Sequence, residues 1–148
     1  MNAVRDAVEE ANAAIGAAIS TLSLPGDLEN LLHDVQHELL DLTDALDGGG
    51  SAPTPDRLRL VLAGQDTPVR PRGFEVLGGL SHGASLLKLA RTVVRRAAHA
   101  VPPGPVQEYL DLVAEVLLAA AFRAEEYERV EVPLGLCPDV VRPTERSY

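Results

Sequence analysis

The strongest constraint on the fold is a run of apolar residues at helical spacing between residues 27 and 46. Asp27 is expected to cap the start of this helix, and the three glycines at 48–50 to end it. Leucine and valine recur every three or four positions, which places them on one side of an α-helix. These residues are Leu28, Leu31, Leu32, Val35, Leu39, Leu42 and Leu46. Such a helix needs partners that cover its apolar side.

The same period continues along the chain. Helices are expected over residues 2–22, 54–63, 81–101 and 106–127, with a loop over 64–80. The short helix at 54–63 should begin with Thr54 as its cap and Pro55 in the first helical position. No parallel-sheet pattern and no internal repeat are visible. We therefore expect an all-α, five-helix bundle over residues 1–128 with antiparallel main helices, then an irregular tail over 129–148 in which 130–132 could be extended.

Composition narrows the class of protein. The chain has 148 residues and is 46% hydrophobic, which suits a single globular domain. Its net charge of -9 disfavours nonspecific binding to nucleic acid or to an anionic membrane. The lone Cys137 allows no intrachain disulfide and reads as a packing thiol. With no targeting leader and no long apolar run visible, a cytoplasmic protein is expected.

Residues 73–101 combine a glycine-punctuated loop, which carries Phe74, with a helix that has basic residues along one side. Lys88, Arg91, Arg95 and His99 share that side. The opposite side is apolar and includes Leu86, Leu89, Ala90, Val93, Ala97 and Ala100. Like charges four residues apart repel, so this side requires carboxylates, an anionic ligand or solvent. It is the first candidate for a functional surface.

The last helix carries acidic and large apolar residues on one line opposite its core stripe. These residues are Glu108, Asp111, Glu115 and Phe122, with Leu118 alongside. A solvated surface would explain the acids but not Leu118 and Phe122, so the pattern favours a pocket wall or an interface.

Two pairs of histidines can be considered as metal ligands or as acid-base groups. His33 and His37 have the spacing that can hold a metal, but they lie opposite the apolar stripe, so we expect them to face solvent and expect no metal site. His82 and His99 border the basic helix and are better placed for acid-base work.

Several segments together resemble the PduO-type ATP:corrinoid adenosyltransferases. The family's FVLPGG and LLHxARTVxRRAER segments are matched by FEVLGG at 74–79 and LLKLARTVVRRAAH at 86–99. Its DELNxxIG and IQxxLFDLGxxL segments are matched by EEANAAIG at 9–16 and VQHELLDLTDAL at 35–46. More loosely, YLDLVAEVLLAAAFR at 109–123 takes the place of YLNRLSDLLFxLAR. The ARTVVRR piece is the most specific match.

The resemblance implies a cobalamin adenosyltransferase-like homotrimer with its site between subunits. In the family, cob(I)alamin attacks the 5′ carbon of ATP, and a phenylalanine at the position of Phe74 displaces the lower cobalt ligand. Carried over, Arg91 would pair with Glu9 of a neighbouring chain, and Arg95 would face the anion. The alternative for Phe74 is an ordinary hydrophobic residue that plugs the bundle end. The separate alternative for the arginines is a buried ion network of Glu9, Arg91, Arg95 and Glu115 without a ligand. The small residues Ala13 and Gly16 and the apolar Leu40 and Leu118 also favour assembly.

Departures from the family's pattern argue against adenosyl transfer. We see no glycine-rich TGDxGxT nucleotide loop ahead of the first helix, and RRAER becomes RRAAH at 95–99. The Asn, Arg and Asp of NRLSD become Asp111, Leu112 and Glu115, which removes a cation and adds negative charge. We expect ATP binding and ATP-dependent transfer to be lost.

The sequence thus favours a divergent protein that binds a corrinoid or another small apolar ligand at a subunit interface. The expected ligand-binding residues are Phe74, Arg91, Arg95, Asp111, Glu115 and Phe122, and the catalytic candidates are Arg95, Glu115 and His99. Two alternatives stay open: a scaffold repurposed as a small-molecule enzyme in specialised metabolism, and a working corrinoid adenosyltransferase.

Overall fold

The computed structural model describes residues 2–64 and 81–131, which form five α-helices and their connections. The helices are α1 (Asn2–Ser20), α2 (Gly26–Leu46), α3 (Asp56–Ala63), α4 (His82–Ala100) and α5 (Pro105–Glu131). No strand occurs within these ranges. The expected all-α, five-helix architecture is confirmed.

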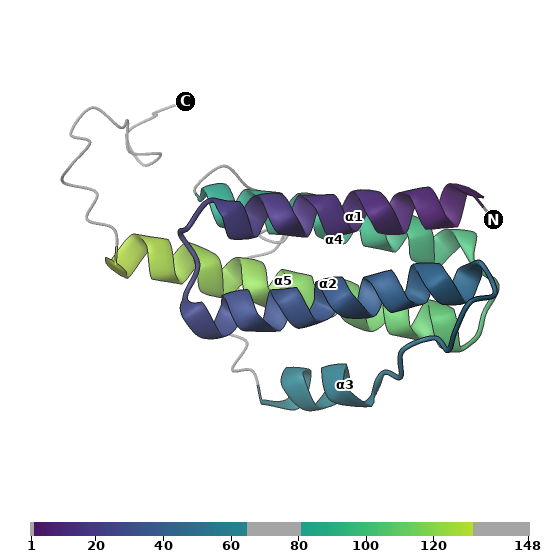
Figure 1. Cartoon of the computed structure of the whole chain (residues 1–148). Coiled ribbons are helices and arrows are strands. Elements are labelled where there is room, and N and C mark those ends of the chain that lie inside the picture. The colour runs from purple at the N-terminus through teal and green to yellow at the C-terminus, as the bar shows by residue number, and fades with distance from the viewer. Residues whose placement is uncertain (1, 65–80, 132–148) are drawn as a thin grey trace, which may run out of the picture.

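The four long helices lie side by side in two layers, and the short α3 lies outside them (Figure 1). In the first layer α1 packs beside α2; in the second α4 packs beside α5. The layers meet where α4 contacts α1, and α3 rests against α5. The bundle therefore has an α1/α2 face on one side and an α4/α5 face on the opposite side.

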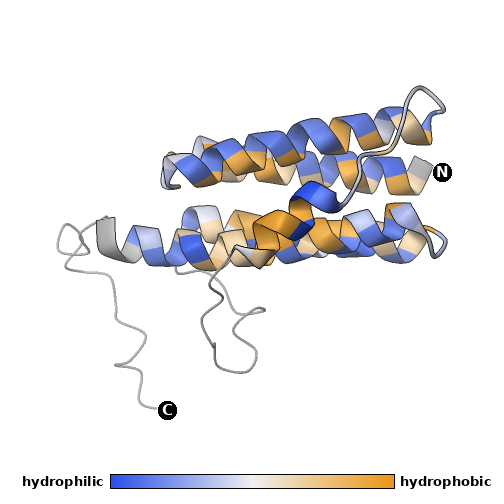
Figure 2. Ribbon diagram, turned by 90° about the horizontal axis from the view of Figure 1, so that it is seen from below, coloured by the Kyte–Doolittle hydropathy of each residue, from blue (hydrophilic) through white to orange (hydrophobic). Residues whose placement is uncertain are grey.

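The core lies between the layers, where the apolar sides of the helices meet (Figure 2). Five residues of the α2 stripe are fully shielded from solvent: Leu28, Leu32, Val35, Leu39 and Leu42. Leu31 and Leu46, at its margins, are half-buried. Burying one such side chain stabilises the fold by about 1.5–3 kcal/mol. The α2 prediction is thus confirmed residue by residue.

Helix ends differ more from expectation than helix interiors do. Asp27 does not cap α2, because the helix begins at Gly26 with Pro25 as its N-cap and no side-chain cap bond. Asp27 instead lies in the first turn and pairs with Arg123 of α5 at 2.6 Å. Thr54 does not cap α3 either, since the N-cap is Pro55. The expected side-chain caps of α2 and α3 are therefore absent. Asp27 is paired with Arg123, and Pro55 takes the cap position of α3.

The start of α4 agrees with the expectation, but the end of α5 does not. Ser81 caps α4, where its hydroxyl accepts a hydrogen bond from the Ala84 amide at 3.2 Å. The last helix continues to Glu131, so residues 130 and 131 are helical rather than extended. No helix within the described ranges is long and apolar enough to cross a membrane.

Candidate functional site

Helix α4 packs against both α1 and α5, so its buried surface is wider than one apolar stripe. Lys88 is consequently only 8% exposed, although the sequence placed it on the open basic side. Leu89, expected on the buried side, is 53% exposed. The prediction for Lys88 was wrong because a second neighbouring helix covers the flank of α4 that carries it. The prediction for Leu89 was also wrong, because neither neighbouring helix covers this side chain.

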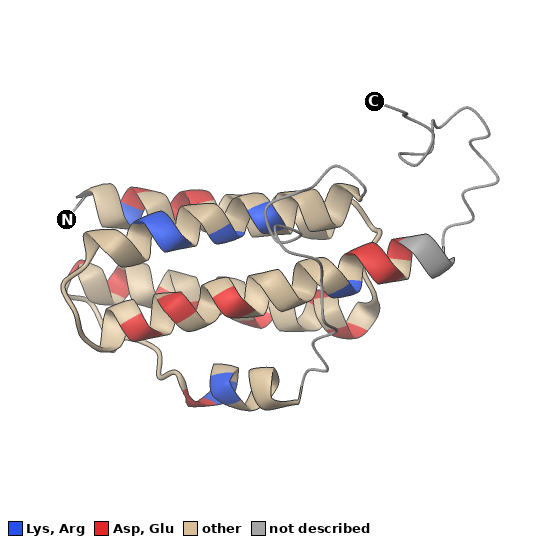
Figure 3. Ribbon diagram, turned by 180° about the vertical axis from the view of Figure 1, so that it is seen from behind, with Lys and Arg blue, Asp and Glu red and all other residues tan. Residues whose placement is uncertain are grey.

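The predicted site residues that belong to α4 and α5 lie along the outer junction of these two helices, which we call the α4/α5 seam. Basic residues of α4 and acidic residues of α5 run side by side there (Figure 3). Arg95, His99, Asp111 and Glu115 are exposed, while Arg91 is half-buried. Lys88, Phe122 and Glu125 extend the seam, because Lys88 of α4 contacts both other residues on α5. Leu118 lies one turn before Phe122 on α5.

Two contacts fix the register of the seam. Near the turn between the helices, Gln107 Nε2 donates to the Ala98 carbonyl at 3.3 Å; at the other end, Lys88 contacts Glu125. Because the helices run antiparallel, Asp111 and Glu115 lie opposite the stretch of α4 that carries Arg95 and His99. Such a junction offers guanidinium donors on one side and carboxylate acceptors on the other.

The end of the seam near Phe122 is buried. Phe122 is only 6% exposed, and Leu118, one turn earlier, is half-buried. Lys88 Nζ lies 6.0 Å from the centroid of the Phe122 ring and 2.8 Å from Glu125 Oε1. Glu125 was not among the residues expected at the site. It lies three residues after Phe122, so the line of Asp111, Glu115 and Phe122, extended by one turn, would have included it.

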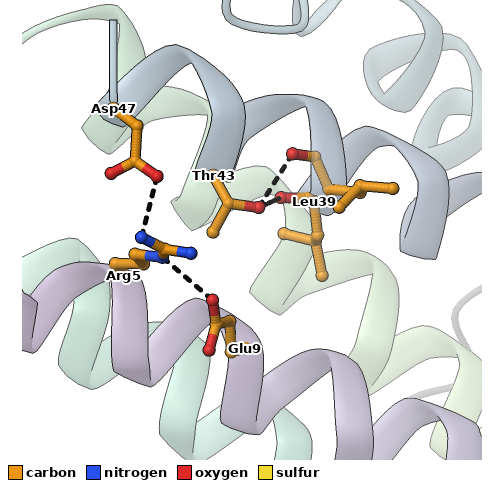
Figure 4. Close-up of polar contacts among 6 residues, drawn as sticks. Arg5, Glu9, Leu39, Thr43 and Asp47 are labelled. Carbon is orange, nitrogen blue, oxygen red and sulfur yellow. Dashed lines mark hydrogen bonds and ion pairs between the residues drawn. The ribbon is translucent and has the colours of Figure 1, made fainter. Parts of the chain in front are cut away.

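Glu9 lies on the α1/α2 face, opposite the seam. Arg5 joins it to the C-cap of α2, with Nε 2.9 Å from Glu9 Oε1 and Nη1 2.8 Å from Asp47 Oδ2 (Figure 4). The alternative of a buried network of Glu9, Arg91, Arg95 and Glu115 does not form within one chain, because Glu9, Arg95 and Glu115 are exposed. A pairing of Glu9 with Arg91 remains a prediction about a second copy.

The α1/α2 face also contains an open hollow of about 380 Å³. It is lined by Asn12, Ala13, Gly16, Gln36, His37 and Leu40. Asn12 Nδ2 donates to the Gln36 carbonyl at 3.2 Å, and Gln36 Nε2 donates back to the Asn12 carbonyl at 3.3 Å. A Cβ on Gly16 would lie 3.2 Å from Gln36 Nε2. The small residues of α1 thus admit α2 of the same chain, and Leu40 remains 55% exposed beside them.

The histidines take the positions that the sequence suggested. His33 and His37 are exposed on α2, where His37 Nδ1 contacts the His33 carbonyl at 2.8 Å. Among the described residues no group of three potential ligands could hold a metal ion. His82 and His99 are exposed on α4. Phe74 and Cys137 lie outside the described residues.

A sequence model of a family described as cobalamin adenosyltransferase matches residues 3–103. The match spans α1 to α4 and reaches the turn before α5, so it includes the basic half of the seam but not its acidic half. Comparisons with curated proteins and with solved structures gave no significant match. Because the match covers more than half of the chain, this protein belongs to the cobalamin adenosyltransferase family.

Proposed function

We propose that this protein binds a corrinoid, or another flat apolar ligand with polar edges, along the α4/α5 seam at a subunit boundary. Family membership makes a corrinoid-related function the starting point. The observation that carries the proposal is the arrangement of the seam. Arg95, Asp111 and Glu115 are exposed along it, and the buried ring of Phe122 lies at one end. An apolar wall with a few convergent polar groups is typical of small-molecule sites.

Each side chain of the seam suits part of such a ligand. A corrin ring carries amide side chains around an extended flat face. The carboxylates of Asp111 and Glu115 can accept from amide N–H groups, and the guanidinium groups of Arg91 and Arg95 can donate to amide oxygens. Phe122 supplies an aromatic surface, and Phe74 is expected to supply another.

The acidic residues of the seam oppose the binding of ATP. Asp111 and Glu115 are both exposed, on the stretch of α5 that faces Arg95 and His99. A triphosphate bound there would bring its negative charge toward two carboxylates. We therefore propose that ATP-dependent adenosyl transfer is lost and that the retained property is ligand binding.

The ligand site is completed by a second copy of the chain. In this arrangement the α1/α2 face of one copy, with Glu9 and the hollow beside Leu40, covers the α4/α5 seam of the next. The two faces differ, so the contact is head-to-tail and can close into a ring. A homotrimer of this kind would bring Glu9 to Arg91 of the neighbouring copy.

A repurposed small-molecule enzyme is the second candidate. The observation that favours it is the exposure of His99 and Glu115 on facing stretches of the seam. An imidazole and a carboxylate near one ligand can share proton transfer, with Arg95 stabilising negative charge.

Absorption spectroscopy with cobalamin tests the proposal. Oxidised and reduced cobalamin are each mixed with the protein, with and without magnesium-ATP. We expect a saturable change in the cobalamin spectrum that does not depend on ATP and is weakened in Arg95→Ala, but not in Arg123→Gln on another side of α5. Absence of a spectral change at protein concentrations well above micromolar would refute corrinoid binding. Formation of adenosylcobalamin would show instead that the transferase is active.

A further inference from the structure

The α4/α5 seam ends in a buried ion pair. Lys88 Nζ lies 2.8 Å from Glu125 Oε1, and the two side chains are 9% and 3% exposed. Every other ion pair within the described ranges includes a side chain that is at least 33% exposed. This pair is therefore distinct from the surface pairs of the bundle.

The ring of Phe122 lies beside this pair. Phe122 is buried, yet it is not a member of the continuous apolar cluster that the described residues form. Its ring centroid lies 6.0 Å from Lys88 Nζ, within the range of a cation–π contact. Glu125 thus holds the ammonium group of Lys88, and the ammonium group lies near the ring.

Stability alone does not account for such a pair. Removing two charges from water costs several kcal/mol per ion, and apolar residues of similar volume often stabilise a fold as well or better. Within the described ranges Glu125 Oε2 is buried and has no hydrogen-bond partner, which adds to the cost. A contribution to geometry explains the arrangement better than a contribution to the free energy of folding.

We infer that Lys88 and Glu125 are positioning residues that fix the ring of Phe122 as the aromatic wall of the ligand site. Because Phe122 is only 6% exposed in the single chain, a corrinoid or similar ligand would contact the exposed edge of this ring. The inference rests on the proposed function for its ligand, but the placement of the ring can be tested without one.

The first test uses no ligand. The chain contains two phenylalanines, so selective carbon-13 labelling of phenylalanine rings gives a simple NMR spectrum. The signals of Phe122 are identified by their loss in Phe122→Leu. In the double variant Lys88→Met/Glu125→Leu, which replaces the pair with apolar groups and should stay folded, we expect these signals to shift and broaden.

Two further variants separate positioning from general packing. Lys88→Arg retains the positive charge and should keep the Phe122 signals closer to wild type than Lys88→Met does. Arg96→Gln removes the exposed pair with Glu10 from the same helix and should leave them unchanged. A folded double variant whose Phe122 signals match those of wild type overturns the inference.

The second test measures ligand binding by cobalamin titration. Both Phe122→Leu and the double variant should bind about three- to tenfold more weakly than wild type, which corresponds to the loss of one aromatic contact with the ligand. The triple variant Phe122→Leu/Lys88→Met/Glu125→Leu should bind cobalamin no more weakly than Phe122→Leu alone, because both changes act through the same ring. Fully additive losses would contradict the inference. If wild-type protein does not bind cobalamin, the proposed function fails, and the labelling experiment alone decides whether the pair positions Phe122.

Discussion

The phenol of Tyr109 on α5 donates a hydrogen bond to Glu38 Oε2 on α2 at 2.7 Å. The other oxygen of Glu38 accepts from Arg57 Nε of α3 at 2.6 Å. One carboxylate thus joins three helices, including the short α3. Tyr109 itself is 1% exposed, so its hydroxyl has little access to water as an alternative partner.

Loss of this hydrogen bond should destabilise the bundle. Tyr109→Phe removes the donor to a charged acceptor and should lower the free energy of unfolding by about 1.5–3 kcal/mol. Urea unfolding followed by circular dichroism measures the loss. Tyr127→Phe, a half-buried tyrosine on the same helix, is the control and should lose less. Equal losses in both variants would show that Glu38 finds another donor.

Tyr109 should also make stability fall at alkaline pH. Burial, and then the hydrogen bond to Glu38, raise the pKa of the phenol well above its ordinary value of 10.0. The folded protein therefore keeps a proton that the unfolded chain releases, and stability is lost as the pH rises above about 10. Spectrophotometric titration should find one phenol, missing in Tyr109→Phe, that ionises only on unfolding. Reversible ionisation of that phenol in folded protein near pH 10 would contradict the expectation.

Gly83 should not tolerate a larger side chain, because α4 begins against the connection between α1 and α2. A Cβ at this position would lie 2.8 Å from Leu24 Cδ2, and Leu24 is only 4% exposed. The overpacking strain in Gly83→Ala should exceed the gain in helix propensity, for a net loss of about 1 kcal/mol. Gly26→Ala is the matched control, since a Cβ added there would meet no atom within 4 Å. Thermal melting of both variants gives the comparison, and a stabilised Gly83→Ala would show that Leu24 readily moves.

Arg91 and Arg95 should differ in their effects if the seam is a site between subunits. Arg91→Ala should weaken assembly, because it removes the proposed pair with Glu9 of the neighbouring copy. Glu9 keeps its contact with Arg5, so the loss should not exceed about 3 kcal/mol. Arg95→Ala should leave assembly and melting nearly unchanged and reduce ligand affinity by about 1.5–3 kcal/mol, the worth of one charged hydrogen bond. Light scattering and cobalamin titration measure the two effects. Arg96→Ala, with its exposed pair to Glu10, should matter less than either.

The oligomeric state itself is a separate prediction. We expect light scattering to give the mass of a trimer at micromolar concentration. Leu40→Glu should shift the sample toward monomer, because it places a charge beside the hollow that the neighbouring copy would cover. Leu60→Glu is the control, since Leu60 is 75% exposed on the outer α3. A stable monomer of wild-type protein would remove the intersubunit site from consideration.

The sequence by itself determined the number of helices in the described ranges, their approximate bounds and most residues of their core stripes; Leu89 and Ala100 of α4 are exceptions. The period of leucine and valine in α2 named five fully buried residues correctly, because burial of an apolar stripe depends mainly on local spacing. The resemblance of residues 86–99 likewise indicated the family that the match over residues 3–103 shows. The sequence placed Glu108, Asp111, Glu115 and Phe122 on one line of the last helix. All four residues lie within α5.

Only the tertiary structure decided which polar residues are buried and what they contact. Helical spacing placed Lys88 with Arg95 and His99, but it could not show that α5 covers the flank where Lys88 lies. The partners of Glu125, Asp27 and Glu38 are 37, 96 and 71 residues away in the chain. Local patterns contain no information about such contacts, because they depend on which helices become neighbours and in what register.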